Sequence, residues 1–320
     1  MKLGPALAAG CTCILKPSEE APLTTLALGQ LALVAGIPAG VVNVLPGLGR
    51  SVGAALTAHP DVDKVSFTGS TFVGKQIVEA AAGNLKKLSL ELGGKSPMIV
   101  LPDADLDKAI PALATGMFWN SGQVCTAGTR LLAHKDIAHQ VAEGVANAGR
   151  RMKVGYRTDP GVDLGPLVSR RQLERVEGYV SRGREEGATV LSGGSRLGQR
   201  GYYFEPTVLV DVDPSMTVVK EEIFGPVPGV MSFDDVDQAV AMANDTSFGL
   251  ASSVWTTDVN SAVTMARKLR AGRVNINVHR AGGVQLPIGG FKESGWGREC
   301  GPDGVDEFLE TKSIVTRMWA

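Results

Sequence analysis

Four short runs rich in β-branched residues alternate with helical patterns over the first ninety residues, and this alternation constrains the fold more than any other feature. The runs TCILK, GVVNVL, KVSFTG and KKLSLEL have the composition of strands. The segments between them, APLTTLALGQLALVAG, SVGAALTAHP and TFVGKQIVEAAAG, carry apolar residues at helical spacing and end in Gly or Pro. Strands that alternate with helices form βαβ units. We therefore predict an α/β fold with a doubly wound parallel sheet of the kind that binds nucleotides.

A second α/β domain is expected to begin after LELGGKSP, near Lys95. Beyond this point the sequence predicts a helix at ADLDKAIPALATGMFWN, a strand at RLLAH and long amphipathic helices around IAHQVAEGVANAGRRM and SRRQLERVEGYVSRGREEG. Strands and helices again alternate from TVLSGG to AGRVNIN. The closing ETKSIVTRMWA has the pattern of a terminal β-strand, and an exposed strand edge favours pairing with another subunit.

Charge and composition exclude several classes of function. The 320 residues carry 32 basic and 33 acidic side chains, and this balance offers no basic field to nucleic acid or to a lipid surface. No apolar run approaches the ~20 residues that a membrane helix needs. Four sparse cysteines without a CxxC pair indicate a reducing compartment. We expect a cytoplasmic protein with neither nucleic-acid nor membrane partners.

The opening MKLGPALAAGC can be interpreted in two ways. It resembles a short lipoprotein signal that ends at Cys11, but Gly4, Pro5 and Gly10 interrupt the apolar run. We interpret it as the helix-to-strand entry of a cofactor domain.

Two glycine-rich turns and one polar turn are candidates for binding phosphate and ribose. PGLGRSVG, with Gly49 and Gly53, and FTGSTFVG, with Gly69 and Ser70, each follow a predicted strand and precede a helix, where small residues let backbone N–H groups approach an anion. We expect them at the same ends of adjacent parallel strands, where ligands collect. Glycine also serves ordinary tight turns, so a purely structural role stays open.

The turn ILKPSE adds Lys16, a donor to phosphate or ribose, and Glu19, whose carboxylate accepts ribose hydroxyls and repels a 2′-phosphate. Glu19 therefore favours NAD over NADP, although NADP and a merely solvated carboxylate both stay open.

Cys125, in NSGQVCTAGT, is the strongest candidate nucleophile. Its small neighbours leave room for a substrate and for backbone donors near the sulfur. A buried structural cysteine is the alternative. Glu91 ends an apolar strand just before Gly93 and Gly94, which makes it a candidate general base.

The four histidines have no neighbours that suggest a Cys/His dyad or a metal site, and we predict surface or helix positions for them and no bound metal. They are His59, His134, His139 and His279.

Together these motifs resemble the aldehyde dehydrogenase superfamily. LELGGKSP, GQVCTAG, KEEIFGPV, GGFKESGWGRE and EFLETKSI, together with LKPSE and FTGSTFVGK, follow the family's order over essentially the whole chain. The resemblance implies a partial Rossmann-like cofactor domain, a catalytic α/β domain and a C-terminal oligomerisation strand. The corresponding regions are 1–93 for the C-terminal part of the NAD-binding domain, 94–293 for the catalytic domain, and 294–320 for a return to the cofactor domain with the oligomerisation strand.

The resemblance also implies oxidation of an aldehyde to a carboxylic acid with NAD. Cys125 matches the family nucleophile, which forms a thiohemiacetal and then a thioester, and Glu91 matches the base that activates the hydrolysing water. Lys2 and Glu299 match a pair proposed to relay protons away from that base. The implied cofactor-binding residues are Lys16, Ser18, Glu19, Gly49, Gly53, Phe67, Gly69, Ser70, Leu92, Glu222 and Phe224.

The chain departs from the family pattern in two places. Family members carry about a further domain's worth of chain at the front, with an oxyanion-stabilising Asn in a WN motif that this sequence lacks. In addition, Asn275 stands where the family more often has an aromatic residue. The resemblance therefore implies an N-terminally truncated dehydrogenase that forms a homodimer or homotetramer, and a catalytically silent chain that pairs with full-length relatives is the alternative. The aldehyde itself is left open.

Overall fold

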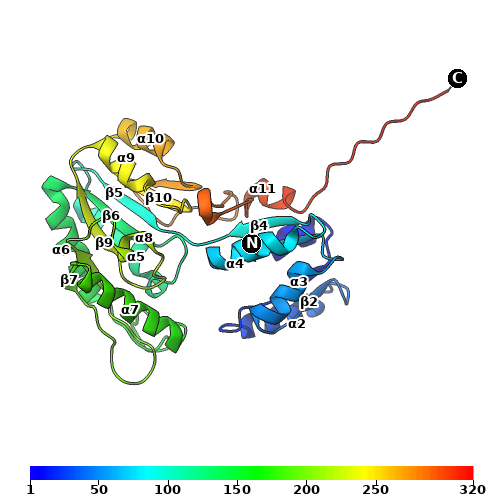
Figure 1. The fold of residues 1–320 in the computed structure, drawn as a ribbon, viewed down its shortest axis with the longest axis horizontal. Coiled ribbons are helices and arrows are strands. Elements are labelled where there is room, and N and C mark those ends of the chain that lie inside the picture. The colour runs from blue at the N-terminus through cyan, green and yellow to red at the C-terminus, as the bar shows by residue number, and fades with distance from the viewer. Residues whose placement is uncertain (320) are drawn as a thin grey trace.

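A computed structural model describes residues 1–319 as two α/β bodies and a C-terminal segment that extends away from both (Figure 1). The smaller body holds β1–β4 with their helices, and the larger body holds β5–β11. The chain passes from one to the other between Glu91 and Ser96.

In the smaller body, strands pair in parallel as β1 with β2 and as β3 with β4, and one helix connects the strands of each pair. The predicted βαβ organisation is therefore confirmed. The elements are α1 (Leu3–Ala8), β1 (Cys13–Leu15), α2 (Leu23–Val34), β2 (Val42–Val44), the π-helical turn η1 (Gly49–Gly53), α3 (Ala54–Ala58), β3 (Lys64–Thr68), α4 (Thr71–Ala81) and β4 (Lys87–Glu91).

The expectation that the two glycine-rich turns follow adjacent strands is wrong. β2 and β3 share no ladder within residues 1–319, because β2 pairs with β1 and β3 pairs with β4. Within residues 1–319 the two strand pairs belong to separate sheets, β1-β2 and β12-β4-β3, so the turns after β2 and β3 do not follow neighbouring strands.

The larger body is a seven-stranded sheet in the order β11-β10-β5-β6-β9-β8-β7, parallel except for the pair β7–β8. Its elements are β5 (Ser96–Val100), α5 (Leu106–Phe118), the 3-10 turn η2 (Trp119–Gly122), β6 (Gly128–His134), α6 (Lys135–Arg151), α7 (Arg170–Glu185), β7 (Thr189–Ser192), β8 (Val208–Val210), α8 (Thr217–Lys220), β9 (Gly229–Phe233), α9 (Val236–Asn244), β10 (Ala251–Trp255), α10 (Val259–Lys268) and β11 (Arg273–Ile276).

Alternate residues of the central strands enter separate cores on the two faces of this sheet. Met98 and Val100 of β5 pack in the core that α5 and α6 cover, whereas Ile99 packs in the core that α7, α9 and α10 cover. Strand β5 is buried along its whole length, as a central strand with helices on both faces should be.

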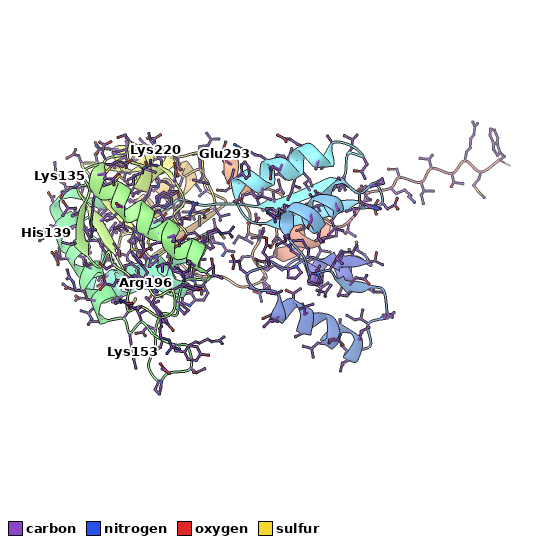
Figure 2. All side chains as sticks on the ribbon, turned by 60° about the horizontal axis from the view of Figure 1, so that its bottom comes forward. Lys135, His139, Lys153, Arg196, Lys220 and Glu293 are labelled. Carbon is purple, nitrogen blue, oxygen red and sulfur yellow. The ribbon has the colours of Figure 1, made fainter. Side chains whose placement is uncertain are left out.

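The chain then returns to the smaller body. After the 3-10 turn η3 (Lys292–Ser294), β12 (Gly295–Trp296) pairs antiparallel with β4. Glu293, which Figure 2 labels near the meeting of the two bodies, forms an ion pair with Lys75 of α4 at 2.8 Å. The last helix, α11 (Gly301–Asp306), contacts α1.

The terminal strand expected at ETKSIVTRMWA is not formed in this chain. Residues 310–319 have no regular secondary structure, and the segment points away from the body (Figure 1). A strand needs a neighbour for its backbone hydrogen bonds, and no strand within residues 1–319 pairs with this segment. Residue 320 lies outside the described residues.

Within residues 1–319, no helix has both the length and the apolar character required to cross a membrane.

Buried Arg130 ties β6 to two other elements and generates a prediction about stability. Its guanidinium donates to the carbonyls of Lys95, Met242 and Ala243 at 2.6–2.9 Å, the last two of which belong to the final turn of α9. The final carbonyls of a helix lack intrahelical donors, and Arg130 supplies donors to two of them, although the Met242 carbonyl also accepts the N–H of Asp245 at 3.3 Å. We expect Arg130→Met to lower the free energy of unfolding by about 3 kcal/mol, because buried acceptors lose their donors.

Urea unfolding measures this loss, and Arg151→Met, at an exposed position of α6, is the matched control. Equal stability of the two variants would contradict the assigned role of Arg130.

Candidate active site

Cys125 lies in the loop between η2 and β6, and two glycines fix where this loop sits. A Cβ on Gly94 would meet the carbonyl oxygen of Cys125 at 2.2 Å, and a Cβ on Gly122 would meet the carbonyl oxygen of Gly225 at 2.2 Å. Both distances are far inside van der Waals contact, so only glycine allows the loop to approach these backbones so closely. The Cys125 side chain is half-buried.

Glu91 is the last residue of β4 and is 5% exposed. Its place is set by pairing on both sides, with Thr68 of β3 and with Gly295 of β12, and its carbonyl accepts the N–H of Gly69 at 3.0 Å. Burial raises the pKa of this carboxyl to about 7, although the positive charge of Lys2 acts in the opposite direction. Glu91 can therefore both hold and release a proton near neutral pH.

The Cys125 thiol lies in an environment that opposes ionisation. Burial, together with the negative charges of Glu222 and Glu91, raises its pKa to about 11, while the backbone N–H groups of Thr126 and Cys125 act the other way. A thiol with this pKa is protonated at neutral pH. Reaction at this sulfur therefore requires either added positive charge or removal of a neighbouring negative charge.

Lys2 and Glu299 form an ion pair, so the structure brings these two predicted residues together from opposite ends of the chain. Burial lowers the pKa of Lys2 to about 8, whereas the charges of Glu91 and Cys125 raise it. The second carboxylate oxygen of Glu299 is buried without a hydrogen-bond partner within residues 1–319. The cluster thus contains an amine and two carboxylates close to the thiol.

Glu222 is connected to the same loop from the opposite side. Its Oε1 accepts the N–H of Gly94 at 3.0 Å, and burial raises the pKa of its carboxyl. Arg175 of α7 donates to the Glu222 carbonyl at 2.6 Å, and Gln172 donates to the Phe224 carbonyl at 2.8 Å. Phe224 has a left-handed backbone with φ 58°, which these hydrogen bonds help to maintain.

The structure also brings together the predicted ribose-binding turn and the first glycine-rich turn. Lys16 Nζ donates to the carbonyls of Pro17 and Gly47 at 2.6 and 3.1 Å, and its side chain lies 3.6 Å from the position of a Cβ on Gly53. The backbone N–H groups of Glu19 and Gly49 lower the pKa of the Glu19 carboxyl, which is about half exposed. Ser18 accepts the N–H of Glu20 and closes the turn.

The second glycine-rich turn is shaped by the side chains of Phe67 and Leu92. A Cβ on Gly69 would meet the Phe67 ring at 2.3 Å, and a Cβ on Gly74 would meet Leu92 at 2.6 Å. Ser70 caps α4 by accepting the N–H of Val73 at 3.3 Å. This cap leaves only the N–H groups of Thr71 and Phe72, at the start of this eleven-residue helix, without an acceptor among residues 1–319, and such groups can bind an anion.

His279 was missed by the sequence interpretation. The prediction of a surface or helix position is confirmed for His139, which is exposed on α6 (Figure 2), but it is wrong for His279, which is 5% exposed. Its Nε2 lies 2.6 Å from the carbonyl oxygen of Thr126, the residue after Cys125, and its Nδ1 lies 3.0 Å from Ser253 Oγ. This contact joins residues that are 153 positions apart in the chain and forms only when the two segments pack together. No local signal in VNINVHR therefore reveals it.

Comparison with known proteins agrees with this architecture. The model of the Aldehyde dehydrogenase family matches residues 1–314. An aldehyde dehydrogenase from Enchytraeus buchholzi is 47% identical over 99% of the chain, and the putative aldehyde dehydrogenase DhaS from Bacillus subtilis is 46% identical over 98%. The chain spans 64% and 63%, respectively, of the lengths of these relatives.

Solved structures of aldehyde dehydrogenases have the same fold as this chain. An aldehyde dehydrogenase structure from Bacillus cereus superposes with a TM-score of 0.96 at 45% identity, and an indole-3-acetaldehyde dehydrogenase in complex with NAD+ superposes with a TM-score of 0.96 at 46% identity. Each match covers 98% of this chain and 64% of the solved chain.

A cysteine and a strand-end carboxylate at the junction of two α/β bodies are typical of enzymes that act through a covalent intermediate. The comparisons narrow this class to one family. The chain belongs to the aldehyde dehydrogenase family, whose members are oxidoreductases.

The electrostatics of the cysteine generate a prediction that is independent of any substrate. Because the Glu91 carboxylate raises the pKa of the Cys125 thiol, we expect Glu91→Gln to lower that pKa below its value in the unmodified chain. The measurement is the pH dependence of alkylation by iodoacetamide, followed by mass spectrometry of the peptide that contains Cys125. Glu177→Gln, at an exposed position of α7, is the control, and an unchanged or higher pKa in the Glu91 variant would contradict the electrostatic coupling.

Proposed function

We propose that this chain carries the catalytic machinery of an NAD-dependent aldehyde dehydrogenase, which oxidises an aldehyde to a carboxylic acid. The observation that carries the proposal is the electrostatic coupling of Cys125 and Glu91, both in a partly buried site with Lys2 close by. Because the chain spans less than two thirds of the length of its relatives, this activity is proposed for the protein as a whole.

Cys125 is the proposed nucleophile. Its thiolate attacks the aldehyde carbonyl to give a thiohemiacetal, and oxidation of this adduct leaves a thioester on the sulfur. NAD, when bound, supplies the hydride acceptor. The backbone N–H groups of Cys125 and Thr126 stabilise the thiolate against the burial and the carboxylates that oppose it.

Glu91 is the proposed general base for hydrolysis of the thioester. Its pKa of about 7 lets the carboxylate take a proton from water and release it again at neutral pH. The proton then reaches Lys2 and Glu299, whose ion pair lies within the electrostatic reach of Glu91. This cluster therefore forms the proposed proton path.

Two turns are proposed to hold the cofactor. The open first turn of α4 after Ser70 fits the pyrophosphate, with Phe67, Gly69 and Leu92 shaping the backbone around it. Lys16, Ser18 and Glu19, with Gly49 and Gly53 opposite, fit the adenosine ribose, although the Lys16 amine already donates to two carbonyls in this chain. Glu222 and Phe224 are proposed to contact the nicotinamide end of the cofactor.

The ionised Glu19 carboxylate supports NAD as the cofactor, because it repels a 2′-phosphate. NADP remains the second choice.

Exposed apolar side chains support the predicted oligomer. Helix α2 exposes Leu23, Leu31 and Val34, and the closing segment exposes Ile314 and Trp319. Surfaces of this kind associate, so a homodimer or homotetramer is proposed. Cytoplasmic location stays a prediction, since relatives include a cytosolic and a mitochondrial aldehyde dehydrogenase.

The same surfaces favour a second candidate function, a catalytically silent chain that pairs with full-length relatives. This candidate predicts that the isolated chain forms no NADH by itself and co-purifies with a full-length aldehyde dehydrogenase of the family when both are expressed together.

Activity assays test the leading proposal. With NAD and short aldehydes, the protein is expected to form NADH, detected by its absorbance, and Cys125→Ala is expected to abolish the signal. Glu91→Gln is expected to retain the first, acylating turnover but to accumulate acyl-enzyme, seen as added mass on Cys125. Normal steady-state turnover by Glu91→Gln would exclude its role as the base.

The pKa of Glu91 predicts a pH profile. The base acts when it is deprotonated, so thioester hydrolysis is expected to be slow below the pKa of about 7 and to rise as pH increases through that value. Single-turnover measurement of deacylation between pH 5.5 and 8.5 checks this, in a range chosen to bracket the value by about 1.5 pH units on each side. A hydrolysis rate that is independent of pH would contradict the assignment.

A further inference from the structure

Arg280, which follows β11, stacks on Trp119, which begins the segment that carries the nucleophile. The Arg280 guanidinium carbon lies 3.3 Å from the centroid of the Trp119 ring. Trp119 begins the segment that leads through η2 to Cys125, and it is 45% exposed. A positive charge is therefore placed over an aromatic face on the same loop as the reactive sulfur.

The turn that presents Arg280 is anchored in the body of the sheet. Asn277 has a left-handed backbone with φ 54°, and its amide group bonds both the N–H and the carbonyl of Thr256 at 2.8–3.0 Å. Asn275 donates to the carbonyls of Ser252 and His279 at 3.3 and 2.9 Å. These bonds hold the turn between β11 and Arg280 in one conformation.

His279 extends this anchoring to the nucleophile. Burial lowers the pKa of its imidazole, which favours the neutral ring. Because the Thr126 carbonyl can only accept, Nε2 donates to it; Nδ1 then accepts from Ser253 Oγ, which itself accepts from Trp255 Nε1. A fully satisfied chain of hydrogen bonds thus runs from the core to the residue after Cys125, and Arg280 follows directly in the sequence.

The donors of the Arg280 guanidinium are uncommitted. Within residues 1–319, no ion pair includes Arg280 and no side-chain hydrogen bond satisfies it. Stacking on an indole occupies the face of the guanidinium and leaves its in-plane N–H groups free, in the fork geometry that matches a carboxylate or phosphate. By contrast, the two carboxylates whose charges act on Cys125 would repel an anion. They belong to Glu222 and Glu91.

We propose that Arg280, stacked on Trp119, selects aldehydes that carry an anionic group remote from the carbonyl. This inference rests on the proposed aldehyde oxidation, and it adds the class of substrate. The proposal requires a substrate whose carbonyl carbon binds at Cys125 and whose anion binds the free edge of the guanidinium. Arg280 is thus a specificity-determining residue that takes no part in the chemical steps.

A pair of matched substrates tests the selection. Butanal and 4-oxobutanoate have the same chain length and differ in a terminal carboxylate, and kcat/KM is measured for each with NAD. Arg280→Gln is expected to lower kcat/KM for 4-oxobutanoate by about fivefold or more, as loss of one unit charge contact in water implies, and to leave butanal nearly unchanged. Arg267→Gln, on the exposed side of α10, is the matched control.

A second test needs neither NAD nor turnover. Cys125 is alkylated with iodoacetate, which is anionic, and with iodoacetamide, which is neutral and of nearly equal size, and mass spectrometry follows the Cys125 peptide. Arg280→Gln is expected to lower the ratio of the iodoacetate rate to the iodoacetamide rate, and the reversed charge in Arg280→Glu is expected to lower it further. The ratio corrects for any general change in the reactivity of the thiol.

The two tests separate the two proposals. If no aldehyde is oxidised but the alkylation ratio falls as expected, aldehyde oxidation by this protein fails while the anion-selecting role of Arg280 holds. If aldehydes are oxidised and neither the alkylation ratio nor the preference for 4-oxobutanoate depends on Arg280, the inference is overturned and the proposed oxidation stands.

Discussion

The close approach of Gly94 to the nucleophile loop is the contact on which the candidate site depends. Its α-carbon has no room for a side chain because the carbonyl of Cys125 occupies that space, and its N–H binds Glu222. Gly94 also comes three residues after Glu91 at the end of β4. One residue therefore fixes the thiol, the carboxylate assigned to the nicotinamide side and the strand that presents the base. The contact between Gly94 and the Cys125 carbonyl joins two backbones, so it fixes the main chain of the nucleophile loop whatever rotamers the side chains adopt.

The same compactness creates an electrostatic problem. Burial disfavours the charged forms of all four groups. It raises the pKa of Glu91, Glu222 and Cys125 and lowers the pKa of Lys2, so each group shifts toward its uncharged form. The carboxylates also oppose the thiolate directly. The thiolate is therefore favoured by added positive charge, which a nicotinamide cation would bring, or by removal of a neighbouring negative charge.

The sequence predicted the elements well and their spatial relations poorly. Periodicity identified β1–β4 and the helices between them, because the spacing of apolar residues is a property of each segment's own sequence. It did not reveal that β2 and β3 belong to separate sheets, since no local signal records strand order. The burial of His279 and of Arg130 depends on contacts with Thr126 and with Ala243, far away in the chain. The prediction of a terminal strand failed for a related reason. A strand needs the edge of a sheet for pairing, and no sheet edge within residues 1–319 pairs with the closing segment.

Asn275 shows how one buried amide shapes the surroundings of the site. An aromatic residue at this position would pack by its ring, whereas the buried amide of Asn275 instead bonds the carbonyls of Ser252 and His279. A buried amide must be satisfied, so the turn that follows adopts the one geometry that satisfies it. The hydrogen bonds of Asn275 thereby anchor His279 and the turn that leads to Arg280. Recognition in this part of the molecule rests on hydrogen-bonded backbone and a stacked cation, and this favours charge over apolar bulk as the feature that distinguishes substrates.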